Sequence, residues 1–101
     1  MLGAAERWRV PPGAQYEWRH FEDESALFNS RSGLTHFVSA VGAEALGLLF
    51  EQALSTEALT VRLMERCEID DPAAFALQVE RLIVQLCDLD LIERAPNHAH
   101  S

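Results

Sequence analysis

The chain has 101 residues, of which 49% are hydrophobic and 24% charged, and its formal net charge is -8. These values are typical of one small globular domain with a single modest core. A strongly negative charge argues against nucleic acids and anionic membranes as partners, because both attract Lys and Arg, and it mildly favours basic or neutral partners. No segment is apolar for long enough to act as a signal peptide or a membrane span, so we expect a cytoplasmic protein.

The N-terminal segment, residues 1–15, is expected to be loosely ordered. Pro11-Pro12-Gly13 interrupts any regular element there. Residues 7–10 either form a short strand or hold Trp8 against the rest of the domain. The folded domain is therefore expected to span residues 16–94, with a flexible tail at residues 95–101.

Three short strands are predicted next. In residues 16–21, Tyr16, Trp18 and His20 alternate with Glu17, Arg19 and Phe21, and aromatic residues at period two fit a half-buried strand. Residues 22–24 are all acidic and indicate a solvated turn. Residues 25–29 and 34–38 are the second and third predicted strands, and Gly33 in the turn between them suits a positive φ angle.

From residue 39 the hydrophobic period becomes helical. Ser39 is the expected cap of a helix over residues 40–52, which is apolar over more than half of its circumference and should be the central buried helix. Ser55 is the expected cap of a second helix. Asp71 followed by Pro72 marks the start of a third, because proline at the first helical turn loses no hydrogen bond.

The third helix, over residues 72–89, is apolar over more of its surface than one core contact requires. Its main stripe consists of Phe75, Val79, Leu82, Leu86 and Leu89. Ala76, Ile83 and Cys87 widen this stripe on one side, and Leu77 and Val84 lie nearly opposite it. The order β-β-β-α-α-α predicts an α+β fold in which a three-stranded antiparallel sheet precedes a winged-helix-like bundle of three helices.

The sequence has no catalytic constellation, and we expect the protein not to be an enzyme. No Gly-rich phosphate loop follows a strand, and no serine stands in a nucleophile elbow. Cys67 and Cys87 each fall within a helical pattern without zinc-ligand spacing, which favours buried thiols. His98 and His100 in the tail do not make a closed metal site, so we expect no metal and no cofactor.

The third strand leaves an edge on which another strand could pair. Its residues Thr35, His36, Phe37 and Val38 include neither Lys nor Pro, the residues that usually blunt an exposed edge. Either an extended peptide adds to this edge, or a dimer partner or the N-terminal segment around Trp8 covers it. The residues alone leave both possibilities open.

Five segments carry a resemblance to a known family. They are residues 23–29 (Asp-Glu-Ser-Ala-Leu-Phe-Asn), 32–38 (Ser-Gly-Leu-Thr-His-Phe-Val), 43–46 (Ala-Glu-Ala-Leu), 54–56 (Leu-Ser-Thr) and 86–92 (Leu-Cys-Asp-Leu-Asp-Leu-Ile). Together they resemble the PqqD-like family of peptide chaperones, the recognition elements for ribosomally made and modified peptides. Within that family the chain is most similar to the branch found beside HPr-kinase-related proteins.

The resemblance, which covers about residues 8–94, implies a function. Members of the family bind the leader part of a precursor peptide as an added strand and present it to a modifying enzyme; PqqD itself serves pyrroloquinoline quinone biosynthesis. Carried onto this chain, the resemblance makes Thr35, His36, Phe37 and Val38 the peptide-binding edge. It makes the third helix the wall of a groove, with Ala76, Ile83 and Cys87 as the first choice and Leu77 and Val84 as the alternative side. The chain departs from the family at residues 38–40, Val-Ser-Ala, where relatives often have Leu-Asn/Asp-Pro.

Two alternatives stand beside the peptide chaperone. A winged-helix DNA-binding regulator would need a basic recognition helix, and the third helix carries Arg81 alone among acidic and neutral residues. An obligate dimeric interaction subunit of a kinase-related system would seal the strand edge with a second copy. A precursor peptide, a modifying enzyme or an HPr-kinase-related protein are the expected partners, and the sequence identifies none of them further.

Overall fold

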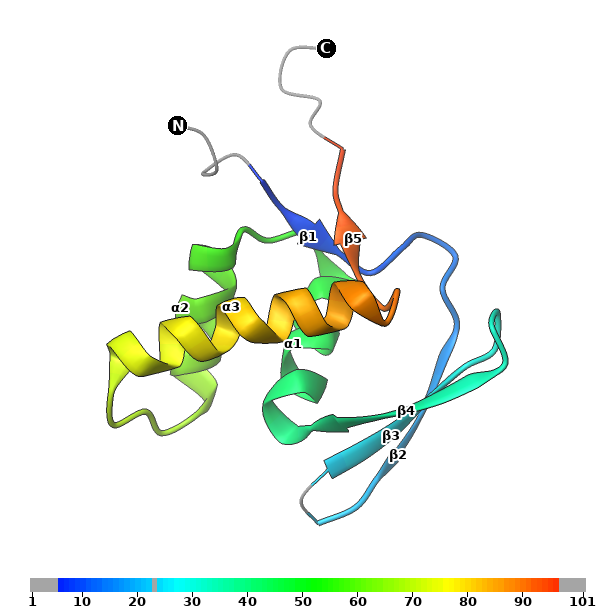
Figure 1. Ribbon diagram of the computed structural model, residues 1–101, viewed down its shortest axis with the longest axis horizontal. Helices are drawn as coiled ribbons and strands as arrows, with labels where there is room; N and C mark the ends of the chain where they lie inside the picture. Colours follow the sequence, from blue (N-terminus) through cyan, green and yellow to red (C-terminus); the bar gives the residue numbers. More distant parts are fainter. Residues whose placement is uncertain (1–5, 23, 97–101) are drawn as a thin grey trace.

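Figure 1 shows the computed structural model of the protein, which describes residues 6–22 and 24–96. Its elements are β1 (Trp8–Arg9), β2 (Tyr16–His20), β3 (Glu24–Asn29), β4 (Leu34–Ser39), α1 (Ala40–Glu51), α2 (Thr56–Arg66), α3 (Pro72–Asp88) and β5 (Glu93–Arg94). The predicted α+β class, with an antiparallel three-stranded sheet followed by three helices, is confirmed. Asp23 of the predicted turn and the predicted tail from residue 97 on, with His98 and His100, lie outside the described residues.

The three-stranded sheet has the order β2-β3-β4, so β3 is central and both other strands are outer. Trp18 and His36 lie opposite Leu27 in the register, and Val38 lies opposite Ser25. Because side chains alternate between the two faces of a strand, these residues share the face that packs against the helices. Leu27 is completely buried there.

The three predicted helix caps are all present. The Ser39 hydroxyl accepts a hydrogen bond from the Gly42 N–H (3.0 Å), and the Ser55 hydroxyl accepts one from the Ala58 N–H (3.1 Å). The Asp71 carboxylate accepts from the Ala74 N–H (3.2 Å), directly before Pro72. Each cap satisfies a backbone donor that the first turn of a helix leaves unpaired.

The core lies between the sheet and the helices, with α1 at its centre as predicted. Ala45, Leu46 and Leu49 of α1 are almost fully buried, and Leu63 of α2 and Val79 of α3 pack into the same cluster. A buried leucine or valine contributes about 1.5–3 kcal/mol relative to exposure, so this cluster is the main source of stability. No helix in residues 6–22 and 24–96 is long and apolar enough to cross a membrane.

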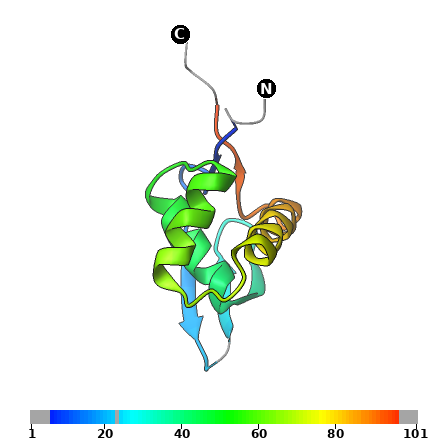
Figure 2. The same ribbon diagram turned by 90° about the vertical axis from the view of Figure 1, so that its left-hand side faces the viewer.

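A second, two-stranded sheet joins the two ends of the described chain. Trp8 pairs with Arg94 and Arg9 with Glu93, and an Arg9–Glu93 ion pair of 2.6 Å reinforces the register. Trp8 also exchanges two backbone hydrogen bonds with Leu54, at 2.8 and 3.0 Å. The segment expected to be loosely ordered therefore contributes β1, and in Figures 1 and 2 the pair β1–β5 lies away from the hairpin that joins β2 and β3.

Candidate functional site

Backbone hydrogen bonds define which groups of the sheet point outward. At one end of the β2–β3 pair the Phe21 N–H donates to the Glu24 carbonyl (2.9 Å), and at the other end the Ser30 N–H donates to the Gln15 carbonyl (3.1 Å). Hydrogen-bonded pairs alternate along an antiparallel ladder. The even-numbered residues of β3, with Ala26 at their centre, therefore direct their backbone groups toward β2.

The same alternation places the free hydrogen-bonding groups of β4. Ser25, Leu27 and Asn29 of β3 direct their backbone groups toward β4, where their partners are Val38, His36 and Leu34. Thr35 and Phe37 lie between these partners, so their N–H and C=O groups point away from the sheet. In the described part of the chain β4 pairs with β3 alone, and these groups form an open edge.

The four predicted edge residues differ in how they face solvent. Thr35 and Phe37 lie on the outer face of the sheet, and the Phe37 side chain is 62% exposed. His36 is half-buried on the face toward the helices, and Val38 is buried there. Trp8 does not cover this edge, because its backbone pairs with Leu54 and its indole N–H donates to the Thr56 hydroxyl (3.2 Å).

A hollow of about 180 Å³ lies beside the end of β4. Ser39 and Val41 form its side nearest the sheet, and the α3 residues Gln78, Arg81, Leu82 and Gln85 form its wall. A methyl group added at Gly42 would lie 3.4 Å from Val38 Cβ and 3.6 Å from Leu82 Cδ1, so this side of α3 packs closely against the start of α1. The hollow and the open edge of β4 together form the candidate functional site.

The α3 residues predicted as groove wall lie elsewhere on the helix. Ile83 is 4% exposed and belongs to the core, whereas Ala76 and Cys87 are half-buried on the flank that turns away from the hollow. Leu77 and Val84 are exposed on the side opposite the core. The structure therefore brings the predicted edge residues together in one strand but does not bring the predicted wall residues to the hollow.

The α3 residues that line the hollow have a sequence signal of their own. Gln78, Arg81, Leu82 and Gln85 are spaced i, i+3, i+4 and i+7, which is one stripe of a helix. The stripe is mostly polar, so apolar spacing alone does not indicate it. A groove that receives a peptide needs a few polar groups as well as apolar ones.

Cys87 lies on the flank of α3 away from the hollow, and its surroundings shift the pKa of its thiol. Burial raises the pKa of the Cys87 thiol, the neighbouring Asp88 raises it further, and Arg94 lowers it. A thiol with a raised pKa is mostly neutral at pH 7 and a poor nucleophile. Among residues 6–22 and 24–96, no three His, Cys, Asp or Glu side chains are grouped so that they could hold a metal ion.

Two of the three comparisons with known proteins find no match, neither a protein-family model nor a curated protein. The fold is similar to that of a solved structure, TbiB1 in complex with the TbiA(beta) leader peptide. The two chains superpose with a TM-score of 0.64 over 84% of this chain and 94% of that one, at 19% sequence identity. At this identity the likeness establishes a shared fold.

Proposed function

We propose that this protein captures a precursor or leader peptide by β-strand addition at β4 and presents it to a modifying enzyme. The observation that carries the proposal is the open edge of β4, with the N–H and C=O groups of Thr35 and Phe37 directed outward beside the α3 hollow. The likeness to a fold that was solved with a leader peptide supports it. So does the resemblance of the sequence to the PqqD-like family.

Strand addition explains affinity and choice of peptide separately. Main-chain hydrogen bonds to Thr35 and Phe37 hold any extended segment, whatever its side chains. Alternate side chains of that segment point to opposite faces of the sheet, so one set lies on the side of the hollow. Leu82 offers this set an apolar contact, and Arg81 offers a guanidinium that binds a carboxylate.

The proposal places residues 35–38 at the peptide edge and the stripe from Gln78 to Gln85 at the groove wall. Ile83 supports that wall from the core, since its side chain is buried behind it. The protein itself performs no chemistry in this account; the modifying enzyme, or an HPr-kinase-related protein in its place, is a separate cytoplasmic partner.

The test is a titration of isotope-labelled protein with the leader peptide encoded nearest its gene, followed by backbone amide NMR. We expect shifts concentrated at residues 34–39 and along the α3 stripe. Phe37→Pro removes an outward N–H, whereas Phe37→Ala removes the same ring and keeps the N–H, so the pair isolates the backbone contact. Loss of one hydrogen bond and the bulk of the proline ring should weaken binding about tenfold relative to Phe37→Ala. Equal binding by the two variants would rule out strand addition at β4.

A mass measurement across protein concentrations separates peptide capture from dimerisation. An edge sealed by a second copy would show a dimer that dissociates on dilution, and Phe37→Pro would then shift the chain to a monomer. DNA recognition by α3 has little support, because Arg81 is the basic residue of that helix and Glu80 stands beside it.

A further inference from the structure

A second hollow lies beside β2, the outer strand opposite β4 in the sheet. It has a volume of about 460 Å³ and separates the inner face of the β2–β3 hairpin from α1, with α2 behind. A smaller hollow of about 200 Å³ adjoins it, and both are lined by Trp18 and Gly47. Together they form a groove that follows β2 along α1, which we call the α1–β2 groove.

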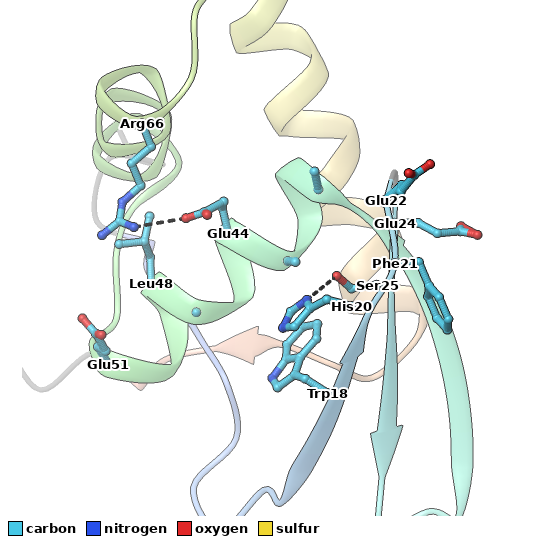
Figure 3. A pocket seen from close by; sticks show the side chains of 13 residues that line it. Trp18, His20, Phe21, Glu22, Glu24, Ser25, Glu44, Leu48, Glu51 and Arg66 are labelled. Atoms are coloured by element: carbon cyan, nitrogen blue, oxygen red, sulfur yellow. Dashed lines mark hydrogen bonds and ion pairs between the residues drawn. The ribbon is translucent and has the colours of Figure 1, made fainter.

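The edge of β2 offers this groove its own backbone groups. The hydrogen bonds at Gln15 and Phe21 direct the odd-numbered residues of β2 toward β3. Tyr16, Trp18 and His20 therefore direct their N–H and C=O groups away from the sheet. The side chains of Trp18 and His20 turn toward α1, so one strand supplies both backbone and aromatic contacts to the groove (Figure 3).

Gly47 keeps the groove open at a cost to the helix. It lies in the interior of α1, where glycine is less favourable than any residue except proline. A methyl group added at Gly42 would meet three atoms within 3.6 Å, so close packing explains that glycine. A methyl group added at Gly47 would meet nothing within 4 Å, so packing does not require glycine there. Because Gly47 has no side chain, the groove beside α1 stays empty at this position.

The walls of the groove combine aromatic surface with negative charge. The rings of Trp18 and His20 stack at 5.8 Å with an interplanar angle of 5°, and a 2.7 Å hydrogen bond between His20 Nδ1 and the Ser25 hydroxyl holds the His20 ring. Four acidic residues line the same hollow, Glu22, Glu24, Glu44 and Glu51, and of these the Glu22 and Glu24 side chains point away from α1 (Figure 3). Arg66 is the arginine of this lining, and it is paired with Glu44 at 3.1 Å.

We propose that the α1–β2 groove is a second docking site, which binds an extended, arginine-bearing segment of a partner protein. Four acidic residues against one arginine at this hollow favour a cation. The Trp18 ring favours a flat cation, because a guanidinium stacks on indole and binds a carboxylate through two hydrogen bonds, which an ammonium does not. Phe50, 62% exposed beside the groove, adds apolar contact for the residue next to that arginine. The site lies on the opposite outer strand from the β4 edge, so both can be occupied at once.

The probe is a short blocked peptide in which leucine and arginine alternate, compared with the same peptide carrying citrulline in place of arginine. Citrulline keeps the shape of arginine and loses its charge. The two tryptophans give separate indole N–H signals in NMR: Trp18 lines the groove, and Trp8, bound to Thr56, is a remote reference. We expect the arginine peptide to shift the Trp18 signal and leave that of Trp8 unchanged, with the citrulline peptide binding about tenfold more weakly. No shift at Trp18, or equal binding of both peptides, would overturn the proposal.

A plug at Gly47 tests the place of binding. Gly47→Trp fills the groove from a position where an added Cβ meets nothing within 4 Å, whereas Gly47→Ala leaves most of the space open. We expect Gly47→Ala to bind the arginine peptide as the native chain does and Gly47→Trp to bind it at least about tenfold more weakly, with unchanged circular dichroism. Phe37→Pro should bind it normally, which separates this site from the β4 edge. Undiminished binding by Gly47→Trp would contradict the assignment.

Discussion

Replacing Gly47 by alanine is expected to stabilise the protein, which is unusual for a substitution near a binding groove. Gly47 has helical neighbours on both sides within α1, and its new methyl group would lie in open space. The change therefore gains the difference in helix propensity between the two residues, about 1 kcal/mol, without a compensating clash. For a domain of this size, that gain corresponds to a rise in melting temperature of about 4–8 °C.

Gly42→Ala is the matched control within the same helix. Its methyl group would lie 3.3 Å from the Ser39 hydroxyl and 3.4 Å from Val38 Cβ, against the helix cap and the buried end of β4. The contact with the Ser39 hydroxyl is tight, so this hydroxyl must shift and its cap on α1 weakens. A weakened cap offsets the gain in helix propensity, so we expect Gly42→Ala to be less stable than Gly47→Ala. Thermal unfolding followed by circular dichroism measures both variants. If Gly47→Ala were neutral or destabilising, or if the two variants changed stability alike, the reasoning from local space would be refuted.

Two further predictions concern ionisable groups. Burial raises the pKa of Tyr16, and the nearby Arg31 opposes this in part. Above the ordinary tyrosine pKa of 10.0 the unfolded chain therefore loses a proton that the folded chain keeps. The free energy of unfolding should fall as pH rises through that range. Tyr16→Phe removes the hydrogen bond from the Tyr16 hydroxyl to the Leu91 carbonyl (2.9 Å), so chemical denaturation at pH 7 should show a free energy of unfolding lower by about 1 kcal/mol. In alkali the variant should lose less further stability than the native protein. Parallel pH profiles of the two proteins would contradict this. The second prediction concerns the Cys87 thiol, whose pKa is raised mainly by burial. In a Cys67→Ser variant this thiol should react with a disulfide reagent at pH 7.4 roughly tenfold more slowly in the native than in the denatured state. Equal reaction rates would show that folding does not protect the thiol.

Local signals account for the features that the sequence determined by itself. The period-two pattern in residues 16–21 and the helical period after Ser39 depend on neighbouring residues, and so do the caps at Ser39, Ser55 and Asp71. A cap is formed by a side chain and a backbone group three residues away, so three-dimensional packing need not be known to place it. The order of the three main strands and three helices followed from such signals, whereas local signals left open whether the edge of the third strand is free or covered.

Tertiary packing decided the features that depend on residues far apart in the chain. Trp8 pairs with Arg94, and no local sequence pattern in either segment predicts that these distant residues pair. Which α3 residues line the hollow beside β4 depends on the rotation of α3 about its own axis. Ala76 and Cys87 flank the core stripe on one side, and Gln78 and Gln85 flank it on the other. Apolar spacing defines that stripe but not which flank faces β4.

The α1–β2 groove is likewise a result of tertiary packing, because residues of β2 and α1 form it together. In the sequence Gly47 is a weak position in a helix, and Trp18 and His20 are aromatic residues in a strand. Packing brings them to one space, because α1 lies against β3 and β4 and leaves a hollow between itself and β2. The sequence determines which local structures form, since they depend on near neighbours; the surfaces available to partners arise from how those structures are oriented against one another, which the packing of the whole core sets.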